Sequence, residues 1–191
     1  MLMDRIIGAF TFRSDVYAEV EGDTQFTTTA WVLVIVIGFL SQLGASVSDN
    51  LVNWLIGAVV STIFAVIAFA LGAFVISAVG RAVFNAEVTF EELVRTLGLA
   101  YVWRIVGVIG VVAVFSDTLA CVVAPVALIA AILGLIAWFV AAKEALDLEW
   151  VQTIVTVILG WIALMVVMFV SGTVLTLLGL TAAGVGGLLG S

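Results

Sequence analysis

The sequence predicts an all-α integral membrane protein with five transmembrane helices and short amphipathic helices before them. Hydrophobic residues make up 65% of the 191 residues, only 10% are charged, and the mean hydropathy is +1.39. A soluble domain is closer to half apolar and about one quarter charged. One core of this size cannot bury so much apolar surface, so lipid must surround most of it.

The distribution of the basic residues predicts the orientation. They lie before the first apolar run, between the second and third or just inside the third, and between the fourth and fifth: Arg5, Arg13, Arg81, Arg95, Arg104 and Lys143. All six therefore fall on one side of a five-span membrane protein. By the positive-inside rule, the N-terminus is cytoplasmic and the C-terminus lies outside the plasma membrane.

Residues 1–28 form an N-terminal interfacial segment. Residues 1–12 place apolar side chains at helical spacing opposite Asp4 and Arg5, which predicts a short helix lying in the membrane interface. Ser14 is expected to cap a second short helix, with Asp15 in its first turn and its end at Gly22-Asp23.

Residues 29–180 form the predicted bundle, and residues 181–191 form a glycine-rich tail. The five spans are expected at about 30–47, 51–79, 99–115, 119–142 and 150–180. The second span is longer than a bilayer requires, so it should tilt or protrude. Pro125 removes a backbone hydrogen bond in the fourth span and predicts a kink.

The loop before the third span contains a helix-start signal. In Thr89-Phe90-Glu91-Glu92, the Thr89 hydroxyl should accept from the Glu92 amide while the Glu92 side chain reaches back. Glu91 and Glu92 also complement the positive end of the helix dipole. Their arrangement favours capping over paired catalytic carboxylates.

Arg104 is the charged residue that lies inside a predicted span, which makes it a candidate functional residue. One interpretation is an interfacial anchor whose side chain extends to the headgroups beside Trp103. The other is an ion pair with Glu91 or Glu144. Arg95, Lys143 and Glu144 are further candidates on the same side, where the acidic turn after Lys143 is either solvated or a partner-binding surface.

Small residues at four-residue spacing occur within the spans, at Ala68/Gly72, Ala73/Ser77 and Ala130/Gly134. Such pairs allow close approach of helix backbones. They serve packing within one bundle as well as packing between proteins.

Several residue types needed for chemistry are missing. The chain has no histidine and a single cysteine, Cys121, and it lacks phosphate-binding, dinucleotide-binding and nucleophile-elbow motifs. We therefore expect no enzyme activity, no cofactor and no metal. The net charge of −7, carried mostly by the cytoplasmic segments, also argues against nucleic acid as a partner.

Three segments carry a resemblance to the Yip1-domain family in its bacterial five-span form. They are the stretch from Arg5 to Arg13 with Tyr17 and Glu19 after it, the stretch from Thr89 to Ala100, and Lys143-Glu144-Ala145-Leu146. Relatives commonly carry a proline where Trp103 stands here, and the acidic-Leu-Tyr-Gly-Pro motif of eukaryotic members is absent. The resemblance implies a five-helix membrane protein without enzymatic activity, engaged in membrane organisation or partner binding.

Three functions follow as hypotheses. The first is a non-catalytic Yip1-like protein that binds lipid and other membrane proteins. The second is a peripheral accessory subunit of a larger photosynthetic or respiratory complex. The third is a channel or a transporter of small solutes or lipid, which would require a polar-lined cavity between the spans. The sequence does not distinguish between a homo-oligomer and a complex with other proteins.

Overall fold

The computed structural model describes residues 2–45, 51–115 and 117–177, and these residues are almost entirely helical. The elements are α1 (Leu2–Phe10), α2 (Ser14–Gly22), α3 (Phe26–Ala45), α4 (Leu51–Phe84), α5 (Phe90–Ala100), the 3-10 helix η1 (Tyr101–Phe115), α6 (Asp117–Leu146) and α7 (Trp150–Leu177). Within the described residues, four apolar segments are long enough to cross a membrane: Phe26–Ala45, Trp54–Phe84, Phe90–Val112 and Cys121–Leu146.

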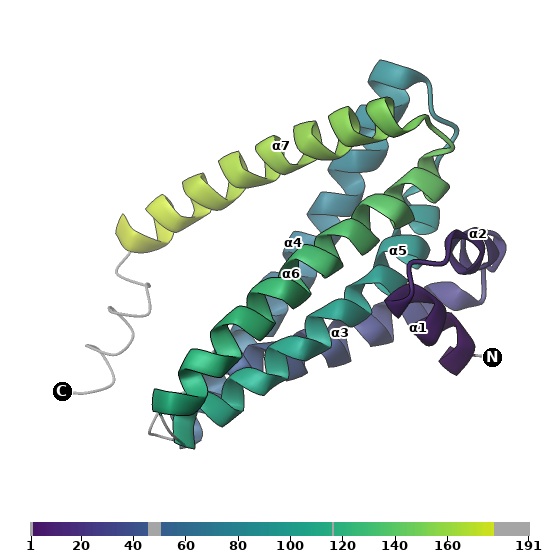
Figure 1. The fold of residues 1–191 in the computed structure, drawn as a ribbon. Helices are drawn as coiled ribbons and strands as arrows, with labels where there is room; N and C mark the ends of the chain where they lie inside the picture. Colours follow the sequence, from purple (N-terminus) through teal and green to yellow (C-terminus); the bar gives the residue numbers. More distant parts are fainter. Residues whose placement is uncertain (1, 46–50, 116, 178–191) are drawn as a thin grey trace.

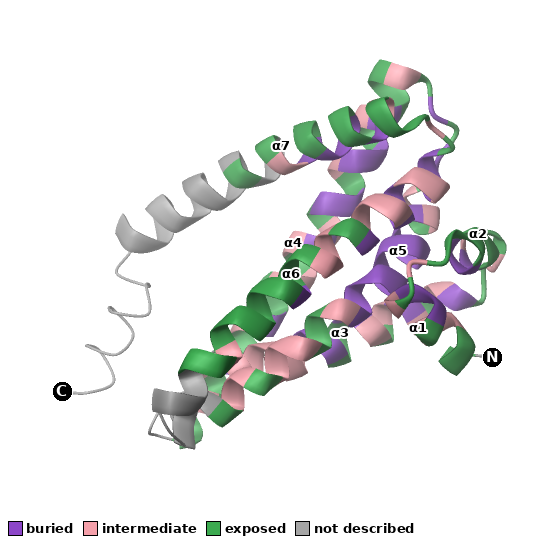
Figure 2. Ribbon diagram, in the orientation of Figure 1, coloured by how far each residue is buried: buried purple, intermediate pink, exposed green. Residues whose placement is uncertain are grey.

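The long helices α3, α4, α6 and the continuous α5–η1 segment form an elongated bundle (Figure 1). The short helices α1 and α2 pack against α5 at one end, which we call the charged end because α1, α2, α5 and the α6–α7 turn carry most of the ionisable side chains. Helix α7 packs on α4 near that end and then diverges from α6. Only 11% to 50% of an 18-residue stretch of each candidate span is buried within the chain, and much of the remaining surface is exposed (Figure 2).

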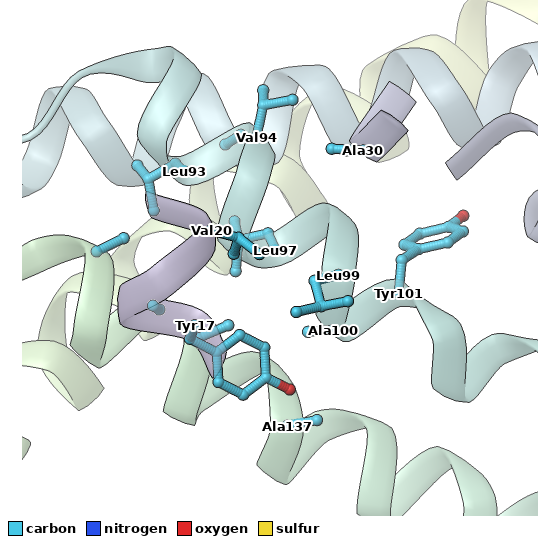
Figure 3. Packing of buried hydrophobic residues seen from close by; sticks show 14 of the residues in the cluster. Tyr17, Val20, Ala30, Leu93, Val94, Leu97, Leu99, Ala100, Tyr101 and Ala137 are labelled. Carbon is cyan, nitrogen blue, oxygen red and sulfur yellow. The ribbon is translucent and has the colours of Figure 1, made fainter. Parts of the chain in front are cut away.

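The hydrophobic core lies at the charged end of the bundle. Every residue of α5 from Leu93 to Ala100 is buried, and Val20 of α2 lies beside Leu97 while the Tyr17 ring is directed toward Ala137 of α6 (Figure 3). Eight consecutive residues of an α-helix point in all directions around its axis. Their burial therefore requires other helices on every side of α5. Here α2, α3, α4 and α6 all contact α5.

The third span changes from α to 3-10 winding at Tyr101. Residues three apart lie on one face of a 3-10 helix, so Gly107 and Gly110 stack on a single face. That face meets α3, where a Cβ on Gly44 would overlap the carbonyl oxygen of Gly107 and a Cβ on Gly110 would lie 2.5 Å from the Gly44 oxygen. The glycines therefore permit backbone-to-backbone packing that any larger residue prevents.

The winding also matches the lengths of the two parallel segments. Gly98 lies against Ala30, and Gly107 lies against Ser41. Ala30 to Ser41 spans about 16 Å of α-helix. Gly98 to Gly107 spans about 17 Å when the residues after Ala100 rise about 2.0 Å each. This tighter winding lets a short apolar segment cover a bilayer-sized distance.

Several local predictions can be compared with the helices. The capping box of Thr89 and Glu92 is confirmed in full. The predicted Ser14 cap is wrong: the extended N-cap residue is Arg13, which makes no capping hydrogen bond and pairs instead with Asp15. The reason is the preceding turn, in which the Arg13 amide donates to the Gly8 carbonyl and places the helix start one residue earlier.

The helix bounds also differ from the expected spans. Helix α3 begins at Phe26, α4 continues to Phe84 and α6 to Leu146, so these helices extend further into the charged end than predicted. Helix α6 continues through Pro125 as one element. The connection around residues 48–50 and the tail 181–191 lie outside the described residues.

Candidate functional site

Arg95 joins the N-terminal segment to the bundle at the charged end. Its side chain is 4% exposed, and its Nε donates to the carbonyl oxygen of Glu21 at 2.8 Å while Nη1 donates to the Thr27 hydroxyl at 3.2 Å. Nη2 donates to the same Glu21 carbonyl. Because Glu21 lies in the last turn of α2, the guanidinium also meets the negative end of that helix dipole. The candidate residue Arg95 therefore forms a buried link between α2, α3 and α5.

Acidic side chains surround the same link. Burial and, to a smaller extent, the negative charges of Asp147, Glu92 and Glu144 raise the pKa of Glu21 to about 7, although Arg95 opposes the shift. The carboxyl groups come from α2, α5 and the end of α6. The fold thus gathers four acidic residues that lie far apart in the sequence into one electrostatically coupled group.

Arg5 ties α1 to α2, and the sequence analysis missed this role. It bonds Glu19 at 2.6 Å and Asp23 at 2.9 Å, and its guanidinium lies 5.0 Å from the centre of the Phe26 ring. Only the antiparallel packing of α1 on α2 brings these groups together. The sequence shows the charged residues of both helices, but it does not show the turn between α1 and α2 that brings Arg5 to Glu19 and Asp23.

Aromatic side chains from seven helices and from the turn after α1 form three groups of ring contacts, with centroids 5.0–6.5 Å apart, which we call the aromatic layer. Its members are Phe10, Phe12, Trp31, Phe69, Phe90, Tyr101, Trp103, Trp138, Phe139 and Trp161. Tryptophan and tyrosine concentrate where hydrocarbon meets headgroups. The layer thus joins the charged end to the apolar remainder of the bundle.

Trp103 connects this layer to α1. Its Nε1 donates to the Ala9 carbonyl at 3.3 Å, and its ring contacts Phe10 edge-on and stacks on Phe12. Phe12 has a φ of 56°, which is unfavourable for a bulky residue, so the stacking on Trp103 offsets part of that strain. Helix α1 is thereby held at the level of the aromatic layer.

Arg104 lies one 3-10 turn beyond Tyr101, and its guanidinium sits 5.1 Å from the centre of the Tyr101 ring. Among the ion pairs of the described residues none includes Arg104, and neither Glu91 nor Glu144 is placed against it. The side chain is directed back to the layer, as an interfacial arginine would be.

The remaining sequence-predicted residues are spread over the surface. Glu91 is exposed in the first turn of α5, and Pro125 is exposed within α6. Lys143 lies 3.8 Å from Glu144 and 5.6 Å from the centre of the Trp150 ring. The structure brings Glu92, Arg95 and Glu144 into one neighbourhood, and it leaves Glu91 and Pro125 outside it.

A cavity of about 850 Å³ lies between α3, α4, η1 and α6, and several residues of the aromatic layer line it: Phe69, Tyr101, Trp103, Trp138 and Trp161. Most of its lining is apolar, with Phe64, Trp138 and Trp161 among the larger side chains. Polar groups are contributed by Ser41, Gln42, Ser61, Tyr101 and Arg104. In the described part of the chain no group of three or more histidine, cysteine or acidic side chains is placed to hold a metal ion.

Apolar helices that expose most of their surface, an aromatic boundary and charges gathered at one end define a multi-pass integral membrane protein. A sequence model of the Yip1 domain matches residues 7–188, nearly the whole chain, and the protein belongs to this family. No curated protein and no solved structure matches the chain.

Proposed function

We propose that this Yip1 family protein is a non-catalytic organiser of the plasma membrane, which inserts α1 into the cytoplasmic leaflet and binds membrane partners at its charged end. In this proposal the charged end is cytoplasmic, as the positions of the basic residues favour. The N-terminal segment 1–28 and the bundle 29–180 then act as one unit, joined by Arg95 and Trp103.

The observation that carries the proposal is the placement of α1. Leu2, Met3 and Ile7 are 44%, 66% and 55% exposed, while the opposite face of the helix packs on α2 and Trp103. An apolar helix face that is fixed at the level of an aromatic layer enters the headgroup region of one leaflet. Insertion into one leaflet expands that leaflet relative to the other and favours curvature.

We propose a five-span topology, and the length of α7 supports it. From Trp161 to Leu177 this helix rises about 24 Å, and α3 rises about 21 Å from Trp31 to Ala45. Beyond the aromatic layer α7 is therefore long enough to cross wherever α3 does. We accordingly propose that the C-terminus lies outside the cell.

Each candidate residue receives a role in this proposal. Glu92 starts α5, Arg95 holds α2 against it, and Trp103 holds α1 at the boundary. Arg104 anchors the third span at the headgroups, while Pro125 shapes α6. The acidic group and Lys143 form the surface offered to partners: Glu21, Glu92, Glu144 and Asp147.

Reconstitution in vesicles tests the role of α1. The protein should lower the mean vesicle diameter relative to protein-free vesicles, as measured by electron microscopy, and Ile7→Gln with Met3→Gln should abolish that effect. Val83→Gln is the matched control, because Val83 is 54% exposed at the charged end but lies on α4. Vesicles of equal size with both proteins would refute the proposed role of α1.

Cysteine labelling tests the topology independently. Cys121 is replaced by serine, and single cysteines are then introduced as Asn85→Cys or Ser191→Cys. A membrane-impermeant reagent added to intact cells should label position 191 alone. Labelling of both positions from the same side would refute five spans.

Purification in mild detergent separates the proposal from the accessory-subunit hypothesis. A fixed set of partners at constant stoichiometry would assign the protein to a larger complex. Recovery of the protein alone or with lipid supports a self-contained membrane organiser.

A further inference from the structure

The cavity between α3, α4, η1 and α6 has the dimensions of a ligand site. Its volume of about 850 Å³ lies within the roughly 300–1,000 Å³ typical of pockets for small molecules. It exists because small residues face it from both sides, namely Ala65 and Ala68 on α4 and Ala130 and Ala131 on α6. Helices α4 and α6 each pack mainly on other elements: α4 on α3 and α7, and α6 on η1 and α5.

The lining chemistry points to a ligand that is mostly apolar with one negative charge. Among the described residues that line the cavity, Arg104 is charged and none is a carboxylate. An arginine within a span is costly unless a partner compensates its charge. Its described contact is the Tyr101 ring, which attracts the cation but supplies no formal negative charge. An anion bound in the cavity would supply that charge.

The exposure of Arg104 selects the class of anion. Arg104 is exposed and also lines the cavity, so a molecule of the surrounding bilayer can reach its guanidinium. Arginine pairs with phosphate through two parallel hydrogen bonds, which suits a headgroup phosphate entering from the bilayer.

The remainder of the cavity suits an acyl chain. Phe64, Leu135 and Trp138 provide apolar surface. Ser41 and Gly107 lie about 6 Å further from the aromatic layer than Arg104, at about 2.0 Å per residue along η1. A chain attached to a headgroup at Arg104 can therefore follow this wall away from the charged end.

We propose that the cavity binds one anionic phospholipid, with its headgroup phosphate at Arg104 and an acyl chain against the apolar faces of α4 and α6. This site is independent of α1 and of the acidic group at the charged end. Failure of the vesicle-diameter experiment therefore leaves the lipid site standing, and failure of the lipid site leaves the role of α1 standing.

Native mass spectrometry of the full chain in mild detergent tests the site. Phosphatidylglycerol and phosphatidylcholine with identical acyl chains are titrated separately. The protein should retain one phosphatidylglycerol molecule in preference to phosphatidylcholine. Arg104→Gln should weaken phosphatidylglycerol binding about tenfold, as expected for losing charged hydrogen bonds to phosphate.

Two further variants separate the contribution of the Arg104 charge from that of the cavity volume. Arg81→Gln is the matched control, since it removes the same charge from an exposed position at the end of α4 and should leave binding unchanged. Ala131→Phe fills the cavity while keeping Arg104, and it should also abolish the bound lipid. If Arg104→Gln does not fold, Ala131→Phe and the preference between the two lipids decide the question.

Three outcomes would overturn the proposal. They are equal binding of the two phospholipids, unchanged phosphatidylglycerol binding in Ala131→Phe, and displacement of phosphatidylglycerol by millimolar inorganic phosphate. The last outcome would assign Arg104 to a free anion and leave the apolar wall unused.

Discussion

Glu21 offers a pH-dependent test of the packing at the charged end. Burial and the charges of Asp147, Glu92 and Glu144 raise its pKa to about 7 from an ordinary value of 4.5, although Arg95 opposes the shift. Because the folded protein binds this proton more tightly than the unfolded chain, the stabilisation from protonation is complete below pH 4.5. It is lost as the pH rises through 7. Glu21→Gln removes this titration and keeps the backbone carbonyl that Arg95 contacts.

The magnitude follows from the two pKa values. At about 1.4 kcal/mol per pH unit, the interval between 4.5 and about 7 gives an upper limit of about 3 kcal/mol. Glu21 is partly exposed, so solvent screening reduces this to about 1–2 kcal/mol. We therefore expect Glu21→Gln to be more stable than the parent protein at pH 8 by about that amount, and equal to it at pH 4.5.

Thermal unfolding in detergent, followed by tryptophan fluorescence from pH 4.5 to 8.5, measures the difference between the two proteins. Glu91→Gln is the matched control, because it removes the same charge from an exposed position in the first turn of α5. A difference between Glu21→Gln and the parent that stays constant over the whole pH range would refute the reasoning. So would an equal pH-dependent difference in the control.

Four other substitutions, one of them a control, test separate parts of the structure by the same thermal measurement. Gly44→Ala should destabilise the protein by about 1–3 kcal/mol through overlap with the Gly107 carbonyl. Gly22→Ala, where no atom lies within 4 Å of the added methyl group, should be nearly neutral. Arg95→Met should cost about 3 kcal/mol because it leaves the buried Glu21 carbonyl without its donor, and a cost near zero would mean that water replaces the guanidinium. Thr89→Ala should cost about 1 kcal/mol through loss of the α5 cap, and an unchanged melting temperature would contradict that role.

The local features of this protein were predictable because they depend on residues close together in the chain. The capping box joins residues three positions apart, so the pattern Thr-Phe-Glu-Glu was sufficient to locate the start of α5. The Ser14 prediction failed for a related reason. The position of that helix start depends on the turn at Thr11 and Phe12, which no short capping pattern encodes.

The 3-10 winding of η1 could not be predicted from its own residues. Its sequence, rich in valine, isoleucine and glycine, fits any apolar span, and runs of 3-10 helix beyond one turn are uncommon. The face formed by Gly107 and Gly110 becomes meaningful only when Gly44 lies opposite. The conformation of the third span thus depends on the partner helix.

The sequence by itself determined the membrane class, the family resemblance and the gathering of charges at one end, because hydropathy and charge act through composition and order alone. Only the tertiary structure decided which distant residues contact one another. Arg95 reaches Glu21 across 74 residues of chain, Trp103 reaches Ala9 across 94, and the cavity beside Arg104 forms from six separate elements. The physical reason is that helix packing turns nonadjacent sequence positions into neighbours, and burial then sets the energy of each contact.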